Sequence, residues 1–371
     1  MSYSGENKYF SFKDGTCESL PNITLSSSAA AEFGRILSAD FKRFCIGCDG
    51  FGHNHILYAI CCGISECGHD VYVCENTDLP SFRFGFPLLS ADCGIYVSGI
   101  GNIVKISIFN NNRFPINDSQ IKNIMNGSPA EISEKNGKIT AVTSFRSIYI
   151  DNIADSINNI NASIPAGISC GNRSVRSLWN EFFTGDDEKI VFQISDDGQR
   201  VNAYSNEVGF ISHEKLILTY AVILSEKEKE IYIPSDFHYA ADFINDENKL
   251  KLVRFSHEDP IPEKAASQRF LYDPLYMCVK LASDRKKFID TIKKLPQFAS
   301  VKREVTLDNA EKIPIKKAYS ENGGKILISR SGKNRITLVA QAYNSETASE
   351  LCHSWSEKLR KINSCGDTLS K

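Results

Sequence analysis

The sequence has no long hydrophobic run. None of its apolar stretches approaches the roughly 20 residues that a membrane-spanning helix needs. Its polar start, MSYSGENKYF, does not have the pattern of a secretory signal peptide. We therefore expect a cytoplasmic protein without a membrane segment.

The chain also has no excess of charge of either sign. Its formal net charge of −2 gives no electrostatic reason to expect a nucleic acid or an anionic membrane as partner. With 371 residues, 42% hydrophobic and 24% charged, it is long enough for several domains that fold without disulfides.

The sequence contains no second CxxC and no paired histidine motif of the kind that completes a zinc site. Twelve cysteines are present, eight of them between Cys17 and Cys93, and Cys45 and Cys48 have the CxxC spacing. A redox or zinc site would use this spacing, but we interpret the cysteines as reduced, small apolar side chains. His53 and His55 are interpreted as solvated residues at the start of a helix, with metal ligation as the alternative.

Strands and helices alternate in the first third of the chain. A helix over Ala29–Leu37, preceded by capping serines, leads to an apolar strand over Phe41–Asp49. A second helix, Ile56–Glu66, precedes a strand at Asp70–Cys74. This order is typical of a layered α/β domain.

The stretch Gly94–Phe109, GIYVSGIGNIVKISIF, predicts two strands joined by a turn of small residues at Ser98–Asn102. Such a loop exposes backbone N–H groups that suit a phosphate or a nucleophile. A plain hairpin turn is the alternative.

This stretch resembles the active-serine segment of the α-D-phosphohexomutases (phosphoglucomutase, phosphomannomutase and phosphoglucosamine mutase), which reads G-I-x-I-T-A-S-H-N-P and continues into N-G-I-K. Gly94 matches, Ser98 takes the threonine place and Lys105 lies at or near the lysine. Ile100 stands where the family has its phosphorylated serine, so no catalytic residue is assigned. Ser98 is the candidate for a displaced nucleophile, although two strand residues separate the positions by about 6–7 Å.

A second family motif, D-G-D-G-D-R, corresponds to Ser195–Arg200. Its three aspartates hold Mg²⁺ in the family. Here Ser195 and Gln199 replace the first and third, Asp197 keeps the second, and Asp196 is an added carboxylate. Because Mg²⁺ requires several hard oxygen ligands, we expect no cofactor beyond a weak Mg²⁺ site at Asp196 and Asp197. A polar turn between strands is the alternative.

A third motif is the family's phosphate loop, R-P-S-G-T-E-P, near the C-terminus. It corresponds to a loop bracketed by strands at Gly324–Ser329 and Ile336–Ala342. An arginine and a lysine beside a Ser-Gly turn can bind phosphate, with a solvated basic turn as the alternative. The predicted phosphate-binding residues are Arg330, Ser331, Gly332, Lys333 and Asn334.

The family's sugar-discriminating G-E-x-S-G-H segment has no counterpart here. Instead the chain passes quickly to Asp273, which stands near the aspartate of the family's G-D-G helix start, and to a predicted helix over Leu275–Leu295.

The resemblance implies an α/β, multi-domain, phosphohexomutase-like fold. Three α/β/α layered domains with mixed sheets, the second and third shortened, would be followed by a C-terminal α+β domain. The expected boundaries are 1–128 with the degenerate serine loop, 129–228 with the degenerate metal loop, 229–300, and 301–371 with the remnant of the phosphate loop.

Loss of the nucleophile and of two metal carboxylates favours a non-catalytic relative of the sugar-phosphate mutases, which binds a phosphosugar or a protein partner. The alternative is an active phosphohexomutase, an isomerase of the phosphoglucomutase/phosphomannomutase type, with a displaced nucleophile. A third interpretation is a structural subunit that pairs with an active mutase. Expected partners are a hexose phosphate and a protein partner or a second copy of the chain, but not nucleic acid or membrane.

Overall fold

A computed structural model gives the fold. It divides into two compact units, one of Met1–Tyr220 with Phe255–Ile289 and one of Ala221–Arg254 with Asp290–Lys371. The structure describes residues 12–13, 15–21, 24–50, 52–157, 163–185, 189–242, 251–256, 261–308, 310, 318–321, 323–332 and 334–365.

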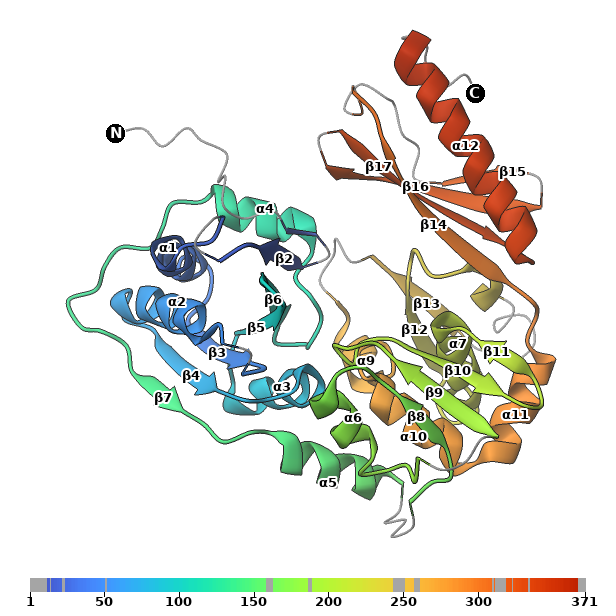
Figure 1. The fold of residues 1–371 in the computed structure, drawn as a ribbon, viewed down its shortest axis with the longest axis horizontal. Coiled ribbons are helices and arrows are strands. Elements are labelled where there is room, and N and C mark those ends of the chain that lie inside the picture. Colours follow the sequence, from blue (N-terminus) through green and yellow to red (C-terminus); the bar gives the residue numbers. More distant parts are fainter. Residues whose placement is uncertain are drawn as a thin grey trace. The chain divides into compact units, whose positions relative to one another are not determined.

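The first unit contains a seven-stranded sheet of order β1-β2-β6-β5-β3-β4-β7 (Figure 1). Strands β3, β4, β5 and β7 run parallel to one another, whereas β1, β2 and β6 pair antiparallel, so the sheet is mixed. The strands are β1 (Phe12–Lys13), β2 (Thr16–Ser19), β3 (Arg43–Cys48), β4 (Asp70–Cys74), β5 (Cys93–Ile100), β6 (Ile103–Asn110) and β7 (Ile139–Ala141).

Helices cover both faces of this sheet, because the strands bury side chains on both sides. Residues Phe44, Ile46 and Cys48 of β3 belong to one core cluster, while Cys45 belongs to a different one that includes Phe82. Cys45 and Cys48 therefore lie on opposite faces and do not form a shared site; both are core side chains, as predicted. The helices are α1 (Ser27–Leu37), α2 (Asn54–Glu66), α3 (Leu79–Gly85), the short 3-10 helix η1 (Phe86–Leu89) and α4 (Asp118–Asn126).

The rest of the first unit is built on a four-stranded sheet of order β11-β10-β9-β8. Its core includes the rings of Trp179, Phe183 and Phe192, with centroids 5.3–6.0 Å apart. The strands are β8 (Gly167–Ser169), β9 (Ile190–Ile194), β10 (Val201–Ser205) and β11 (Gly209–Ile211). The helices are α5 (Arg146–Ser156), α6 (Arg173–Trp179), α7 (His213–Leu224, which continues into the second unit), α9 (Glu263–Gln268) and α10 (Pro274–Ser283).

The single helix predicted over Leu275–Leu295 is wrong. Helix α10 ends at Ser283, and α11 (Arg285–Lys294) begins two residues later. Asp284 between them has the non-helical dihedrals φ −126° and ψ 74°, and its Oδ1 accepts a hydrogen bond of 3.1 Å from the backbone N of Lys287. The chain breaks there because Asp284 caps the second helix.

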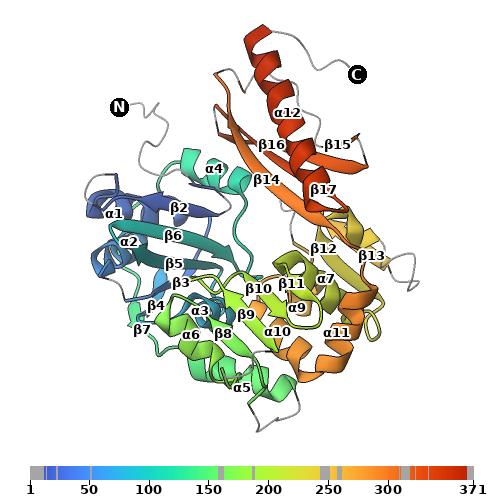
Figure 2. The ribbon, with the colours of Figure 1, turned by 45° about the vertical axis from the view of Figure 1, so that its right-hand side comes forward.

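The second unit combines a two-stranded and a four-stranded sheet. The four-stranded sheet has the order β14-β17-β16-β15, and all of its strand pairs are antiparallel. Helix α12 lies along this sheet (Figure 2). Its core includes Leu338, Leu351 and Trp355. The elements are β12 (Glu230–Pro234), β13 (Lys251–Phe255), η2 (Tyr239–Ala241), β14 (Ala299–Thr306), β15 (Ala318–Glu321), β16 (Gly324–Gly332), β17 (Arg335–Ala342) and α12 (Ser345–Cys365).

The predicted fold class is confirmed: the chain is α/β with several sheets, two of them mixed, and a C-terminal α+β part. The four predicted domain boundaries stay a prediction.

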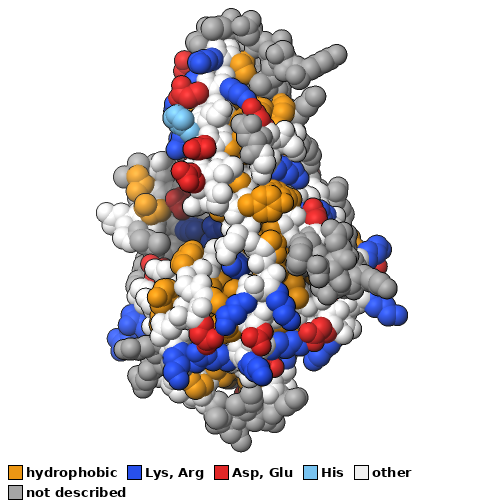
Figure 3. All heavy atoms as spheres, turned by 90° about the vertical axis from the view of Figure 1, so that its right-hand side faces the viewer, with side chains coloured by type: hydrophobic (Ala, Val, Ile, Leu, Met, Phe, Trp, Pro, Cys, Tyr) orange, Lys and Arg blue, Asp and Glu red, His pale blue; other side chains and the backbone are white. Residues whose placement is uncertain are grey.

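Within the described ranges, no helix is long and apolar enough to cross a bilayer. On the face drawn in Figure 3, acidic side chains lie among the lysines and arginines.

We expect acid to destabilise the second unit through His238, whose side chain is 1% exposed. Burial lowers the pKa of His238 to about 4, and its Nδ1 accepts a hydrogen bond of 2.9 Å from the backbone N of Ala240. The unfolded chain binds more protons than the folded chain between pH 6.5 and 4. Stability should therefore fall over this window as pH falls, by on the order of 3 kcal/mol. Urea unfolding at pH 7 and pH 4.5 measures the loss, which His238→Gln should reduce; equal pH dependence in both proteins would contradict the expectation.

Candidate functional site

Strands β5 and β6 form a hairpin in which backbone pairing extends to the two residues of the turn. Its ladder runs from Cys93 opposite Asn110 to Ile100 opposite Ile103, and the turn consists of Gly101, with φ +59°, and Asn102. Two-residue hairpin turns require positive φ, which glycine adopts without strain. The predicted turn over Ser98–Asn102 is therefore too long: Ser98–Ile100 belong to the strand, and their backbone is part of the ladder.

Ser98 lies directly opposite Lys105. Alternation along the strand places Ser98 on the same face as Tyr96, whose ring packs 5.4 Å from that of Phe82. Gly99 faces the other side, where a Cβ would lie 2.4 Å from Nε2 of His53. The structure thus brings His53 against the hairpin, but on the face opposite to Ser98.

Asp49, at the end of β3, also contacts this hairpin. Its Oδ2 accepts a hydrogen bond of 3.1 Å from the backbone N of Gly99. The glycine permits the close approach of His53, which lies on the face opposite to Ser98. The sequence places Asp49 at the end of a predicted strand, but it does not indicate this role.

The loop Ser195–Arg200 joins the antiparallel strands β9 and β10. Oδ1 of Asp197 accepts hydrogen bonds from Oγ of Ser195 (2.6 Å) and from the backbone N of Gln199 (3.0 Å). Oδ1 of Asp196 accepts one of 3.0 Å from the backbone N of Asn172. The two predicted metal ligands thus bond to different parts of the chain. Among the described residues, no group of three or more His, Cys, Asp or Glu side chains could hold a metal ion.

Arg83 of α3 contacts the same loop. Its Nη1 donates to Oε1 of Gln199, and its Nε donates to the backbone O of Arg113. Burial lowers the pKa of Arg83 to about 10, against the opposing effects of Tyr272, Asp273 and Asp197; the guanidinium remains charged at neutral pH. Sequence analysis missed this residue, and its one local signal is a charge within the apolar run LPSFRFGF.

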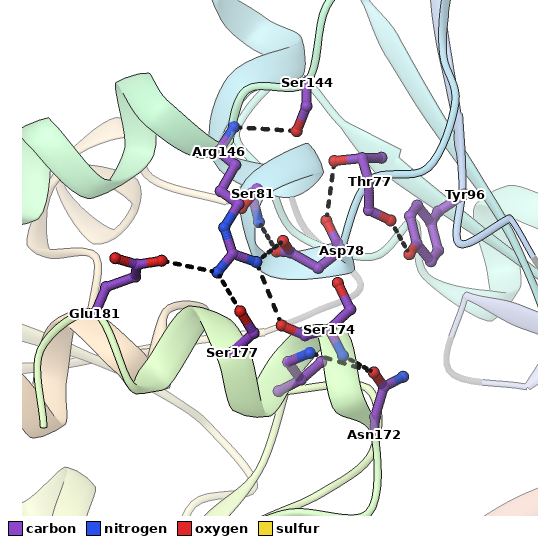
Figure 4. Close-up of polar contacts among 11 residues, drawn as sticks. Thr77, Asp78, Ser81, Tyr96, Ser144, Arg146, Asn172, Ser174, Ser177 and Glu181 are labelled. Atoms are coloured by element: carbon purple, nitrogen blue, oxygen red, sulfur yellow. Dashed lines mark hydrogen bonds and ion pairs between the residues drawn. The ribbon is translucent and has the colours of Figure 1, made fainter. Parts of the chain in front are cut away.

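A polar cluster joins α3, α5 and α6 (Figure 4). Asp78 caps α3 by accepting a hydrogen bond of 2.8 Å from the backbone N of Ser81, and burial raises the pKa of its carboxyl. Nη1 of Arg146 lies 3.7 Å from Oδ2 of Asp78, while its Nη2 contacts Ser177 at 3.0 Å and Glu181 at 3.2 Å. Arg146 therefore holds α6 against the start of α3.

A buried ion pair between Arg269 and Asp273 lies next to Phe84 of α3. Nε of Arg269 is 2.6 Å from Oδ2 of Asp273, and the hydroxyl of Tyr149 donates to Oδ1 of Asp273 at 2.6 Å. The ring of Phe84 lies 4.9 Å from Cζ of Arg269. Asp273 also caps α10, because its Oδ1 accepts from the backbone N of Tyr276 at 3.0 Å.

The predicted phosphate loop is also a hairpin. Strand β16 continues to Gly332, which pairs with Arg335, and the register shifts between Arg330 and Gly332. Arg330 is exposed and lies opposite Ile336. The backbone O of Asn334 accepts from the N of Leu307 at 2.8 Å. Lys333 lies outside the described residues, as does the side chain of Ser331. The five phosphate-binding residues stay a prediction.

Solved structures similar to this chain are phosphohexomutases. A phosphoglucomutase/phosphomannomutase family protein from Burkholderia thailandensis has 14% identity and a TM-score of 0.69, covering 96% of this chain and 98% of that chain. Parafusin, a phosphoglucomutase from Paramecium in its open form, has 10% identity and a TM-score of 0.57, covering 97% and 95%. The N-acetylphosphoglucosamine mutase of Aspergillus fumigatus, in complex with GlcNAc-6P and magnesium, has 11% identity and a TM-score of 0.53, covering 97% of each chain.

No protein-family model matches the sequence, and no curated protein is similar to it. The likeness is thus one of fold. This chain has the phosphohexomutase-like fold that its sequence motifs predict.

Proposed function

We propose that this protein is a non-catalytic member of the phosphohexomutase-like fold and acts by binding a phosphorylated sugar or a protein partner. The observation that carries the proposal is the closed hairpin at Ile100. The resemblance places the phosphorylated serine at this position, where isoleucine has no hydroxyl. The mutase reaction needs a phosphoryl group held on the enzyme and a cation that neutralises its charge in transfer.

The backbone of the hairpin supports the same conclusion. The ladder of β5 and β6 extends to Ile100 and Ile103, and the backbone N–H of Gly99 donates to Asp49. These strand N–H groups are therefore not free to surround a phosphate as those of an open loop would be. The carboxylate of Asp197 is likewise engaged by Ser195 and Gln199. Both features favour a chain that binds rather than one that transfers a phosphoryl group.

A hexose phosphate is the ligand class that the fold favours. The Aspergillus fumigatus mutase was solved with GlcNAc-6P, and Arg330 and Lys333 of this chain provide positive charge beside a Ser-Gly sequence. A fork-shaped guanidinium and an ammonium both suit a phosphate. If the protein instead pairs only with another subunit, phosphate should not protect Lys333 from amine-reactive labelling.

The alternative, an active mutase with a displaced nucleophile, has one observation in its favour. Ser98 and Lys105 are directly opposite each other on β5 and β6, where Cβ atoms lie about 4.5–5.5 Å apart, so the two side chains are cross-strand neighbours. If active, the protein would be an isomerase of hexose phosphates that forms a phosphoserine at Ser98.

The test is incubation of the pure protein with Mg²⁺ and glucose-1,6-bisphosphate, followed by intact mass and coupled assays on glucose-, mannose- and glucosamine-phosphates. We expect no stable phosphoryl adduct and no turnover, but a rise in melting temperature with at least one hexose phosphate. A phosphoryl adduct with turnover would contradict the proposal. Loss of that adduct in Ser98→Ala, but not in the matched variant Ser90→Ala, would establish the alternative.

A further inference from the structure

The loop that the resemblance identifies as a metal loop is in contact with a cation of the chain itself. Arg83 precedes Gln199 by 116 positions, is 7% exposed, and donates from Nη1 to Oε1 of Gln199. Gly198 contacts the same helix, since a Cβ there would lie 2.7 Å from Cγ of Pro80. Helix α3 therefore contacts the loop at two consecutive residues, Gly198 and Gln199.

The oxygen atoms of this loop are arranged as in a hydrogen-bonded turn. Asp197 accepts from the Ser195 hydroxyl and the Gln199 backbone, and the Gln199 side-chain oxygen accepts from Arg83. Mg²⁺ requires near-octahedral oxygen ligands at about 2.0–2.1 Å and keeps several waters. These residues do not fit that requirement, because two of the three motif positions are neutral and their oxygens are already bonded within the chain.

Arg83 also acts on the loop through its charge. It lies within electrostatic range of Asp197, and the hydrogen-bond acceptors of its Nε and Nη1 are neutral: the Arg113 backbone and the Gln199 amide. A second cation at the loop would be repelled by this guanidinium. A guanidinium also presents its donors in a fixed fork, which suits it to hold a loop in one geometry.

We propose that Arg83 takes the structural place of the metal ion, so that the loop Ser195–Arg200 is held by a cation of the chain and is closed to divalent cations. The proposal concerns the metal only and does not depend on whether the protein binds a sugar.

The first test measures metal binding by the full-length protein. We expect the electron paramagnetic resonance signal of free Mn²⁺ to be unchanged by added protein, and the melting temperature to be equal in EDTA and in millimolar Mg²⁺. Stoichiometric loss of the Mn²⁺ signal, or a shift above about 2 °C with the metal, would overturn the proposal.

The second test removes the guanidinium and follows hydrogen exchange over residues 195–200. Arg83→Met should speed exchange of this loop by about tenfold or more. Arg113→Met is the matched control, because Cζ of Arg83 and Cζ of Arg113 lie 5.5 Å and 5.9 Å from the centroid of the Tyr272 ring, while Arg113 donates to the backbone O of Phe84 and not to the loop. If Arg83→Met does not fold, Gln199→Leu removes the partner and keeps the arginine, with the same expected effect. Unchanged exchange in both variants would overturn the proposal.

The third test restores the carboxylates. Ser195→Asp with Gln199→Asp should not bind Mn²⁺ while Arg83 is present, and should bind it when Arg83→Met is added. Binding by the variant that keeps Arg83, or binding by neither variant, would show that the guanidinium is not what excludes the cation.

Discussion

Replacing Asp273 by alanine is expected to lower the free energy of unfolding by about 3–5 kcal/mol. The carboxylate is 4% exposed and pairs with Arg269, whose side chain is 11% exposed, at 2.6 Å. Removing it leaves a buried guanidinium without its counter-charge, a buried Tyr149 hydroxyl without its acceptor, and α10 without its cap. Urea unfolding at pH 7 measures the loss.

Two other variants separate these contributions. Tyr149→Phe removes one hydrogen bond and should cost about 1 kcal/mol. Glu357→Ala removes an exposed ion pair with Arg360, in which both side chains are more than 40% exposed, and should cost at most about 0.5 kcal/mol. If Asp273→Ala were no worse than Glu357→Ala, the buried pair would not stabilise the fold.

Replacing Gly63 by alanine is expected to cost about 3 kcal/mol, although alanine favours a helix by about 1 kcal/mol over glycine. A Cβ at Gly63 would lie 1.9 Å from the backbone O of Ala31, so α1 and α2 would have to move apart. The contact is reciprocal, because a Cβ at Gly34 would lie 2.4 Å from the backbone O of Ile60. Backbone atoms cannot rotate away as a side chain can.

The matched control is Cys62→Ala, the neighbouring exposed residue of the same helix. This substitution introduces the same side chain at a position that does not face α1. The free energy of unfolding of the variant should lie within about 0.5 kcal/mol of that of the unmodified protein. Both variants are measured by urea unfolding. Equal stability of Gly63→Ala and Cys62→Ala would show that the two helices are not in close contact.

Local sequence was sufficient where neighbouring residues decide the structure. The three serines Ser26–Ser28 predict a cap for the first helix, and the structure shows that it is the side chain of Ser26 that accepts from the backbone N of Ala29, at 3.1 Å. Strand Asp70–Cys74 has its predicted bounds. A cap needs only a residue three positions away, and a strand needs only its own apolar pattern. The order of motifs along the chain predicted the fold class through the family resemblance, which depends on sequence order and not on contacts between distant residues.

Local sequence was not sufficient where an apolar pattern continues across a break. The helix expected from Leu275 to Leu295 divides at Asp284, because the aspartate caps the second half. The break was missed because the hydrophobic period continues on both sides of it. The extent of the β5–β6 turn was also missed. The two glycines of this segment, Gly99 and Gly101, permit either an open loop or a tight turn, and cross-strand pairing selects between them.

By itself, the sequence determined the α/β class, the phosphohexomutase-like order of motifs, and the absence of a serine at position 100 and of two loop aspartates. Only the tertiary structure decided that Ser98 faces Lys105 and not His53, and that Arg83 bonds to Gln199. The physical reason is that residue types set which groups can react, whereas distances between residues far apart in the chain depend on how the sheets and helices pack.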